Sequence, residues 1–481
     1  MASIRKNVIT ATISNVFNNA SYFIFVLILA KKYSVHELSY YSLSFNIYFL
    51  TTLFASMGIG NLIIREYHKS SNRVKFVSTL IQLELLSASV AYGATLAIAL
   101  LANYEVRVVH FLFIVCLMAF FDNINFVFSN AFVSLREQQY TSMASMTEGC
   151  TKLLFGAYIY LSGGLSLLVV AAVLVLLRCI TLLVQGTFFV RYHRLHDPSA
   201  HFSLFQFDRS LARMIFRDGK TFFFITLIVA AYNRLPIILL SKLSVMEQVT
   251  YMDMGFKAFN TMSFVPAILV NTFYPTILKH LNEFQQLSEK TSKFIQAYIS
   301  FSNIALVVSY LLVPFAFAIV FGHKFDPSIG VFQLLVLSLT LTGIMSTQAN
   351  ILFAHGLERV DLIMNIGMFI VVIGLVFCLV PTFNSLGAAL SLFIPDLGFV
   401  LVQNKILRKR FPALHIHYSM IDAIVVPLIL AIFIFLNNMP YSRIALYVLS
   451  TGYLVATFTR YKSVLYEMIQ RFFFKTETKR A

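Results

Sequence analysis

Two basic side chains stand inside long apolar stretches of the sequence. Arg234 and Lys257 lie in the segments Thr221 to Ser241 and Tyr251 to Leu278, which a short turn separates. At a helical rise of about 1.5 Å per residue, each lies ~10 to 12 Å from that turn. A charge in hydrocarbon is rare and usually functional, and a guanidinium offers a planar fork to phosphate oxygens. Both residues are therefore candidate ligands for an anion.

The alternative for Lys257 is a structural ion pair, because Asp253 precedes it by one helical turn. Glu148 and Lys152 have the same spacing, with the acid first, and a structural pair is the favoured interpretation there. For Arg234 the functional interpretation is favoured, because no acid stands one turn away.

Three further charges in apolar segments, Asp122, Arg178 and Asp396, have no partner at helical spacing. Each could bind a substrate, carry a coupling ion or join an interhelical pair that the sequence does not show. The candidate substrate ligands are thus Arg234, Lys257, Arg178 and Lys152. The candidates for carrying a coupling proton or sodium ion are Asp253, Asp122, Glu148 and Asp396.

Three amides, Asn15, Asn18 and Asn19, fall on about one turn of the first apolar segment. Amides there can bind sugar hydroxyls or associate with neighbouring helices, and helix association is the commoner use. Asn15 and Asn19 are therefore candidate substrate ligands in a cavity wall, with helix association as the equal alternative.

These residues must be positioned by membrane-spanning helices. The 481-residue chain is 58% hydrophobic and 12% charged, with a mean hydropathy of +0.78. Continuous apolar runs of roughly 20 residues predict an all-α polytopic membrane protein of about fourteen helices. The predicted spans are Val8 to Ala30, Ser39 to Ile63, Phe76 to Leu101, Val108 to Val133, Ser142 to Leu161, Leu165 to Val190, Thr221 to Ser241, Tyr251 to Leu278, Phe294 to Phe321, Ile329 to Phe353, Leu362 to Val380, Gly387 to Gln403, Ile421 to Leu436 and Ile444 to Tyr461.

The formal net charge of +16 resides mainly in short loops between the apolar runs. That pattern is typical of topology determinants rather than of a nucleic-acid-binding surface. Placing most Lys and Arg on the cytoplasmic side predicts that both termini are cytoplasmic.

A polar stretch divides the predicted spans into two lobes. We expect an N-lobe of six helices over residues 1–190, a linker over 191–220, a C-lobe of six helices over 221–410, and two further helices with a basic tail over 411–481. In the linker, apolar Leu204, Phe207, Leu211 and Met214 and basic Arg209, Arg213 and Arg217 recur at helical spacing. This predicts a basic amphipathic helix on the inner leaflet.

The two lobes look related in sequence. At a constant offset, Leu29, Lys32, Ser34, Val35, Glu37 and Tyr41 match Leu239, Lys242, Ser244, Val245, Glu247 and Tyr251. The offset spans an even number of helices, which indicates a parallel repeat about an axis along the membrane normal. The positions that correspond to Arg234 and Lys257 hold Ile24 and Ile47, so the scaffold repeats but the charge does not.

Some chemistry is not indicated. No glycine-rich phosphate loop ends in Lys-Ser or Lys-Thr, which argues against an ATP-driven pump. His193, His196 and His201 stand in a polar stretch beside arginines, where a solvated surface is expected instead of a metal site. We predict no metal and no cofactor apart from a coupling ion, H⁺ or Na⁺.

The sequence resembles the polysaccharide-transport branch of the multidrug/oligosaccharidyl-lipid/polysaccharide (MOP) flippase superfamily, the Wzx-type O-antigen flippases. The resemblance rests on the lobed pattern and on three stretches, which are Tyr232 to Leu240 with the following turn, Phe264 to Pro275, and Val320 to Phe325. It implies two lobes working by alternating access. It also implies an undecaprenyl-diphosphate-linked oligosaccharide as substrate, moved across the bacterial cytoplasmic membrane, with a polymerase and a chain-length regulator as candidate partners.

Two other functions stay open from the sequence. A multidrug or cation antiporter of the same superfamily would need uncompensated acids in its cavity. A membrane enzyme of glycan assembly would need a catalytic constellation, and none is recognisable in the sequence.

Overall fold

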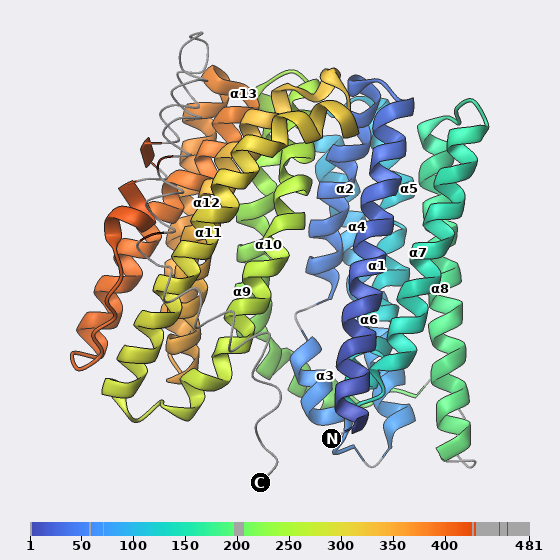
Figure 1. Cartoon of the computed structure of the whole chain (residues 1–481). Coiled ribbons are helices and arrows are strands. Elements are labelled where there is room, and N and C mark those ends of the chain that lie inside the picture. The colour runs from blue at the N-terminus through green and yellow to red at the C-terminus, as the bar shows by residue number, and fades with distance from the viewer. Residues whose placement is uncertain are drawn as a thin grey trace. The chain divides into compact units, whose positions relative to one another are not determined.

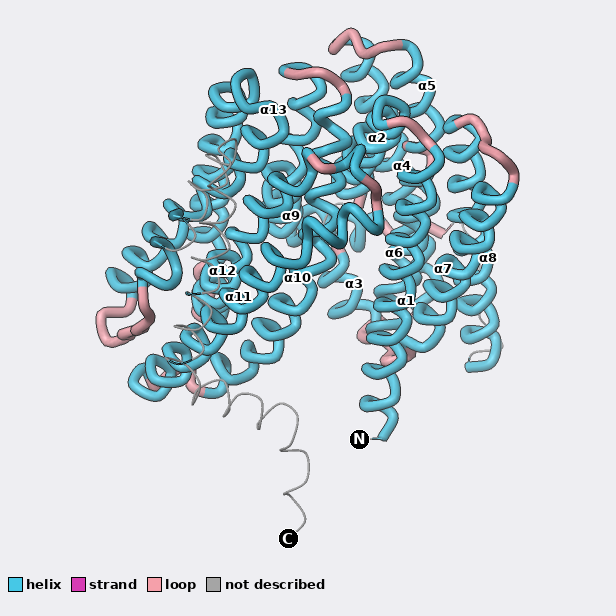
Figure 2. Tube along the Cα trace, turned by 45° about the horizontal axis from the view of Figure 1, so that its top comes forward, coloured by secondary structure: helices cyan, strands magenta, loops and turns pink. Residues whose placement is uncertain are grey.

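The computed structural model describes residues 2–56, 59–70, 72–196 and 206–425, together with 428, 429, 452 and 459. Every regular element among these residues is helical, and most connections are short (Figure 2). The elements, labelled in Figure 1, are α1 (Ala2–Lys32), α2 (Val35–Ala55), α3 (Gly60–Tyr67), α4 (Arg73–Leu101), α5 (Val106–Val115), α6 (Met118–Ser134), α7 (Gln138–Leu161), α8 (Leu167–His196), α9 (Arg209–Leu243), α10 (Glu247–Lys279), α11 (Phe284–Val320), the 3₁₀ turn η1 (His323–Phe325), α12 (Pro327–Ala354), α13 (Glu358–Arg410) and the π-helical turn η2 (Ile421–Val425).

The all-α, multi-pass prediction is confirmed. Within the described part of the chain, eight helices are long and apolar enough to cross a membrane. A ninth span results if the pieces Phe284–Tyr310 and Leu312–Val320, bent by 52°, are taken together.

The predicted spans map onto these helices with three differences. α5 and α6 together occupy one predicted span, and α13 covers two, with a backbone break at Asn384 (φ 53°, ψ −129°). α2 and α7 match predicted spans but are not among the eight apolar ones, because both are rich in hydroxyl-bearing residues. The last two predicted helices lie almost entirely outside the described residues.

By internal packing the chain divides into two compact units, Met1–Ile238 and Leu239–Ala481. The division falls inside α9, whereas the sequence predicts lobe boundaries at the linker. The lobe boundaries and the repeat stay predictions, and the two units are described separately below.

In the first unit, α1 packs along α7 (Figure 1). Gly149 permits this close approach, because a Cβ atom there would lie 2.8 Å from Cε1 of Phe17 and 3.0 Å from Oγ of Ser21. Small residues commonly allow membrane helices to approach in this way. The α1–α7 contact fixes the height at which α7 presents its charged residues.

The α1–α2 turn shows why α2 begins where it does. Ser34 Oγ accepts the backbone N–H of Glu37, and the Glu37 carboxylate accepts the backbone N–H of Ser34, which is a capping box. The matching serine of the second unit is used differently, because Ser244 Oγ donates to Oδ1 of Asn384 at 2.6 Å. That bond ties the α9–α10 turn to the break in α13.

The second unit is built around α12. In the most apolar 18-residue stretch of this helix, 78% of the stretch is buried. Gly343 of α12 lies against the ring of Tyr298, and a Cβ there would come within 2.0 Å of that ring. The Tyr298 hydroxyl donates to the Leu339 carbonyl at 2.7 Å. α12 and α11 are thereby held in register.

The predicted linker is not one separate helix in the structure. α8 extends to His196, α9 begins at Arg209, and residues 197–205 lie outside the described residues. The first turns of α9 are amphipathic, but Leu211, Ala212 and Ile215 are buried in a protein core cluster with residues of α3, α4, α6 and α8. Their apolar side therefore contacts protein rather than lipid.

Candidate functional site

Three helices of the first unit bring four charged side chains together. Arg178 of α8 lies with Nη1 2.7 Å from Oε1 of Glu148 on α7 and with Nε 3.3 Å from Oδ1 of Asp122 on α6. Lys152, one turn along α7, pairs with the same Glu148 oxygen. The Tyr48 hydroxyl of α2 donates to the other oxygen of Asp122. Two carboxylates and two cations balance one another in this cluster, which we call the four-charge network.

The network borders a cavity of about 550 Å³ inside the first unit. Apart from Asp122, Glu148 and Arg178, most of the lining is hydroxyl and amide groups from α1, α2, α6, α7 and α8. These polar lining residues are Ser14, Asn15, Thr52, Ser56, Asn123, Asn125, Ser129, Gln138, Thr141, Ser142, Ser145, Thr181 and Gln185. Such a lining suits a ligand that carries many hydroxyl groups.

Four lining side chains hold buried polar atoms that have no hydrogen-bond partner among the described residues. They are both amide atoms of Asn123, Oδ1 of Asn125, Oγ1 of Thr52 and Oγ1 of Thr141. Asn123 is only 1% exposed. Because a buried polar group without a partner is destabilising, these atoms are poised to bond a polar guest.

The structure gathers five of the predicted site residues around this cavity. Asp122, Glu148, Arg178 and Asn15 line it. Lys152 is buried and pairs with Glu148, and its Nζ lies 5.7 Å from the centre of the Tyr22 ring. The favoured Glu148–Lys152 pair is confirmed. Asn19, by contrast, is exposed and is not among the lining residues.

Arg234 lies apart from the four-charge network, against α2. Its Nη1 donates to Oδ1 of Asn46 at 3.0 Å, and its guanidinium carbon lies 4.3 Å from the centre of the Phe49 ring. Asn46 is held for this contact, because its amide nitrogen donates to the Ser42 carbonyl at 2.8 Å. Arg234 is partly buried, and its role as a substrate ligand stays a prediction.

In the second unit, Lys257 Nζ lies 2.6 Å from Oδ2 of Asp253 on the same helix, α10. The structural-pair alternative for Lys257 is therefore realised, and any role of either residue with substrate or ion stays a prediction. Asp396 of α13 is buried, at 8% exposure.

One acid that the sequence reasoning passed over is Glu84, in the middle of α4. It is 1% exposed, and neither carboxylate oxygen has a hydrogen-bond partner in the part of the chain that the structure describes. The signal was present in the sequence, because Glu84 is a lone acid within the predicted span Phe76 to Leu101. Such residues are functional candidates by default.

The predicted solvated surface is wrong for His193. This residue is 8% exposed, its Nε2 lies 2.7 Å from the Tyr67 hydroxyl and its Nδ1 lies 3.0 Å from the Phe189 carbonyl. The helix α8 continues through it, which turns its ring into the core. No group of three or more metal-ligating side chains occurs among the described residues.

Comparison with solved structures gives the fold a context. The chain is similar to Lipid II flippase MurJ in an inward closed conformation, with a TM-score of 0.68 and 13% identity over 95% of this chain and 100% of that one. The chain is also similar to an inward-facing multidrug resistance MATE family transporter of the MOP superfamily. The TM-score is 0.66, with 13% identity over 85% of this chain and 100% of that one. For a MOP superfamily transporter from Pyrococcus furiosus the TM-score is 0.60, with 13% identity over 86% of this chain and 96% of that one.

These similarities show that the chain shares its fold with these transporters. No curated protein sequence matches the chain. The sequence profile of a family described as "Polysaccharide biosynthesis protein" matches residues 4–281, which is more than half of the chain. The protein therefore belongs to the polysaccharide biosynthesis protein family.

Proposed function

We propose that the protein is a flippase for an undecaprenyl-diphosphate-linked oligosaccharide, the repeat unit of an O-antigen or a similar surface polysaccharide. It would act in the bacterial cytoplasmic membrane by alternating access, coupled to H⁺ or Na⁺. The family description and the fold shared with a lipid II flippase support this assignment. A polymerase and a chain-length regulator are the proposed partners.

The observation that carries the proposal is the polar cavity of the first unit. A membrane protein has little reason to place thirteen hydroxyl and amide side chains around one cavity unless a hydrated or hydroxylated guest occupies it. The unpartnered atoms of Asn123, Asn125, Thr52 and Thr141 supply both donors and acceptors, which a sugar requires. The four-charge network at the edge of the cavity adds fixed dipoles but no net charge.

The experiment measures translocation of a fluorescent lipid-linked oligosaccharide in proteoliposomes. Asn123→Leu keeps the side-chain volume and removes the amide, so we expect translocation to slow about five- to thirtyfold, since one lost hydrogen bond to a ligand is worth ~1 to 2 kcal/mol. Asn130→Leu is the matched control on the same helix, because the Asn130 amide bonds its own helix at the Phe126 carbonyl and does not line the cavity. Equal rates in the two variants would remove the cavity from the proposal.

Arg234 tests whether a diphosphate is bound outside that cavity. Arg234→Ala should leave the lipid-linked unit on the cytoplasmic side in cells that lack the native protein, and Arg234→Lys should restore transport only if charge alone suffices. Unchanged surface polymer in the alanine variant would rule out the anion-binding role.

The MATE-like fold keeps drug export as the competing function. Resistance profiling of an overexpressing strain separates the two, because an antiporter should raise the tolerated concentration of cationic drugs and a flippase should not. Product analysis after adding a lipid-linked substrate tests the third option, an enzyme of glycan assembly.

A further inference from the structure

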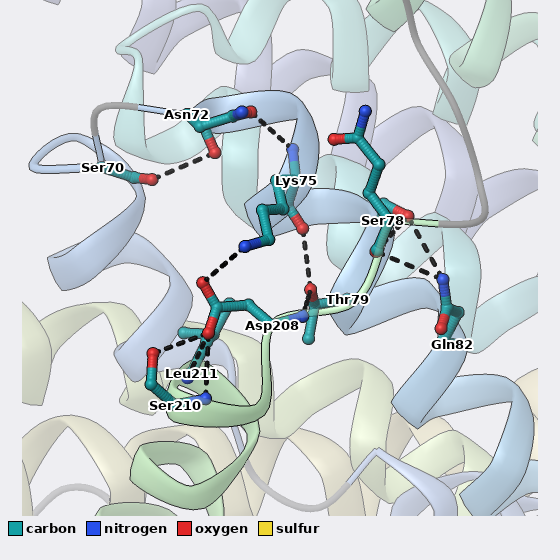
Figure 3. A network of polar contacts seen from close by, with 10 residues as sticks. Ser70, Asn72, Lys75, Ser78, Thr79, Gln82, Asp208, Ser210 and Leu211 are labelled. Carbon is teal, nitrogen blue, oxygen red and sulfur yellow. Dashed lines mark hydrogen bonds and ion pairs between the residues drawn. The ribbon is translucent and has the colours of Figure 1, made fainter.

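The start of α9 is fixed to the start of α4 by a polar network (Figure 3). The Gln206 carbonyl accepts from Ser78 Oγ at 2.8 Å, and the Asp208 backbone N–H donates to Thr79 Oγ1 at 2.9 Å. Lys75 Nζ lies 3.4 Å from Oδ2 of Asp208. These contacts hold the first turns of α9 beside α4 and so define the surface between the two helices.

Asp208 is fully engaged as the cap of α9. Its Oδ1 accepts the backbone N–H groups of Ser210 and Leu211, at 2.9 and 3.2 Å, and the Ser210 hydroxyl at 2.6 Å. The Ser210 hydrogen bond first, and then that of Leu211, lower the pKa of Asp208 to about 2. The carboxylate is therefore charged at neutral pH, and its oxygens already accept bonds from within the protein.

A cavity of about 650 Å³ opens beside this network. Lys75, Arg213 and Arg217 line it, together with small polar groups such as Ser70 and Asn72. Among the lining residues that the structure describes, Asp208 is the one acid and Lys75, Arg213 and Arg217 are the three cations. Arg213 and Arg217 are exposed and lie one turn apart on α9. The cavity is thus suited to an anion.

An apolar pocket of about 290 Å³ lies along the same two helices. Its lining includes Leu86 and Val90 of α4, Phe216 and Phe223 of α9 and Phe54 of α2. Leu86 and Val90 are 63% and 58% exposed, and Phe216 is 55% exposed. These large side chains face the surroundings of a membrane helix, which are hydrocarbon.

The spacing of the two sites matches a phospholipid. Eleven residues separate Lys75 from Leu86 along α4, or ~16 Å at the helical rise. One leaflet contributes ~15 Å of the hydrocarbon thickness. A phosphate held by the cationic cavity would therefore place an acyl chain at the depth of the apolar pocket.

We propose that the cationic cavity and the apolar pocket together form a binding site for one anionic phospholipid. Lys75, Arg213 and Arg217 hold the headgroup phosphate, and the pocket between α2, α4 and α9 holds an acyl chain. Because the site spans α4 and the beginning of α9, bound lipid stabilises the attachment of α9 to α4. The proposal is independent of what the protein transports.

The test uses the full-length purified protein in detergent and titrates fluorescent phosphatidylglycerol and fluorescent phosphatidylcholine. We expect phosphatidylglycerol to bind at least about tenfold more tightly. Arg213→Glu/Arg217→Glu should weaken phosphatidylglycerol binding by more than about thirtyfold, since the loss of two favourable charges alone accounts for roughly thirtyfold and the two added carboxylates repel the phosphate. Arg194→Glu/Arg209→Glu makes the same charge change at exposed positions outside both lining sets and should leave binding within about twofold.

Two further measurements identify the ligand. Val90→Trp fills the apolar pocket and should weaken binding of the lipid without changing the affinity for glycerol phosphate. Arg213→Gln/Arg217→Gln, checked by circular dichroism for intact helix content, covers the case in which the glutamate variant does not fold.

Four outcomes would overturn the proposal. Equal binding of the two phospholipids shows that the site does not select a charged headgroup. Equal phosphatidylglycerol binding by the Arg213→Glu/Arg217→Glu and Arg194→Glu/Arg209→Glu variants shows that the headgroup does not bind in this cavity. Displacement of the lipid by millimolar inorganic phosphate identifies a site for free anions. Displacement by an equimolar polyprenyl diphosphate identifies a substrate entry site instead.

Discussion

Two acid–base pairs at the same spacing have different surroundings in the two units. Glu148–Lys152 of α7 and Asp253–Lys257 of α10 both place the acid one turn before the lysine, and both acids are buried. In the first unit Arg178 from α8 joins the pair and links it to Asp122, so a third helix depends on it. In α10, Lys257 Nζ and Asp253 Oδ2 pair across one turn of the same helix. The same local spacing is thus part of an interhelical network of ion pairs at Glu148.

The largest expected loss of stability comes from breaking the four-charge network, which joins α6, α7 and α8. Glu148→Gln removes the shared acceptor of Lys152 and Arg178 and leaves two cations against one carboxylate. We expect a loss of about 3 to 5 kcal/mol in the free energy of unfolding, as for other broken buried ion pairs. Because the chain has no tryptophan, unfolding in detergent should be followed by circular dichroism.

A matched variant separates charge from packing at this position. Glu148→Gln combined with Lys152→Met restores charge balance and should recover roughly half of the lost stability. No recovery in the double variant would mean that the network is not held by charge balance.

Breaking the Asp253–Lys257 ion pair of α10 should cost less stability. Lys257→Met removes an ion pair between successive turns of one helix, whereas Glu148→Gln also removes the acceptor of Arg178 on a second helix. We expect a loss of about 2 kcal/mol, mostly regained in the double variant with Asp253→Asn. A loss as large as that of Glu148→Gln would erase the contrast between the two pairs.

Glu84 extends the comparison to a buried acid whose carboxylate has no hydrogen-bond partner among the described residues. Replacing a buried, unsatisfied polar group by an apolar one is neutral or stabilising. Glu84→Met should therefore raise the free energy of unfolding by roughly 1 kcal/mol, the opposite sign to the paired acids.

The free energies of unfolding of wild type and Glu84→Met are compared by circular dichroism in detergent. A Glu84→Met variant less stable than wild type would contradict this expectation.

The smallest effect is expected at the water-exposed pair of Lys75 and Asp208. Asp208→Ala removes a helix cap and should cost about 0.5 to 1 kcal/mol at pH 7. The pKa of Asp208 is depressed, so its contribution is present above an unfolded pKa of about 3.9 and disappears as the pH falls toward about 2. The stability difference between wild type and Asp208→Ala should accordingly shrink between about pH 4 and pH 2.

Asp208→Asn is the control for the cap, because asparagine caps helices as well as aspartate does. It should stay close to wild type at pH 7 and show no pH-dependent change of its own in that window. A pH-independent gap between wild type and Asp208→Ala would show that the carboxylate charge is not used.

The sequence predicted the ion pairs within single helices better than the contacts between helices that form the cavity of the first unit. Asp253–Lys257 and Glu148–Lys152 could be predicted because residues four apart on a helix are neighbours whatever surrounds them. Arg178 and Asp122 were recognised as intramembrane charges, but their meeting depends on which faces of α6 and α8 pack together. Apolar residues cover all sides of those spans, so periodicity does not give their orientation.

The sequence by itself determined that this is a multi-pass helical membrane protein, where most of its spans lie, and which charges stand inside them. Those properties follow from run length and composition, since every backbone group in lipid must be bonded within its own helix. Only the tertiary structure decided that Asn123 and its neighbours enclose a polar cavity, that Glu84 is buried away from any hydrogen-bond partner among the described residues, and that α9 begins beside Lys75. These facts depend on contacts between helices distant in the chain, and in lipid such contacts rest on packing and hydrogen bonds rather than on apolar pattern.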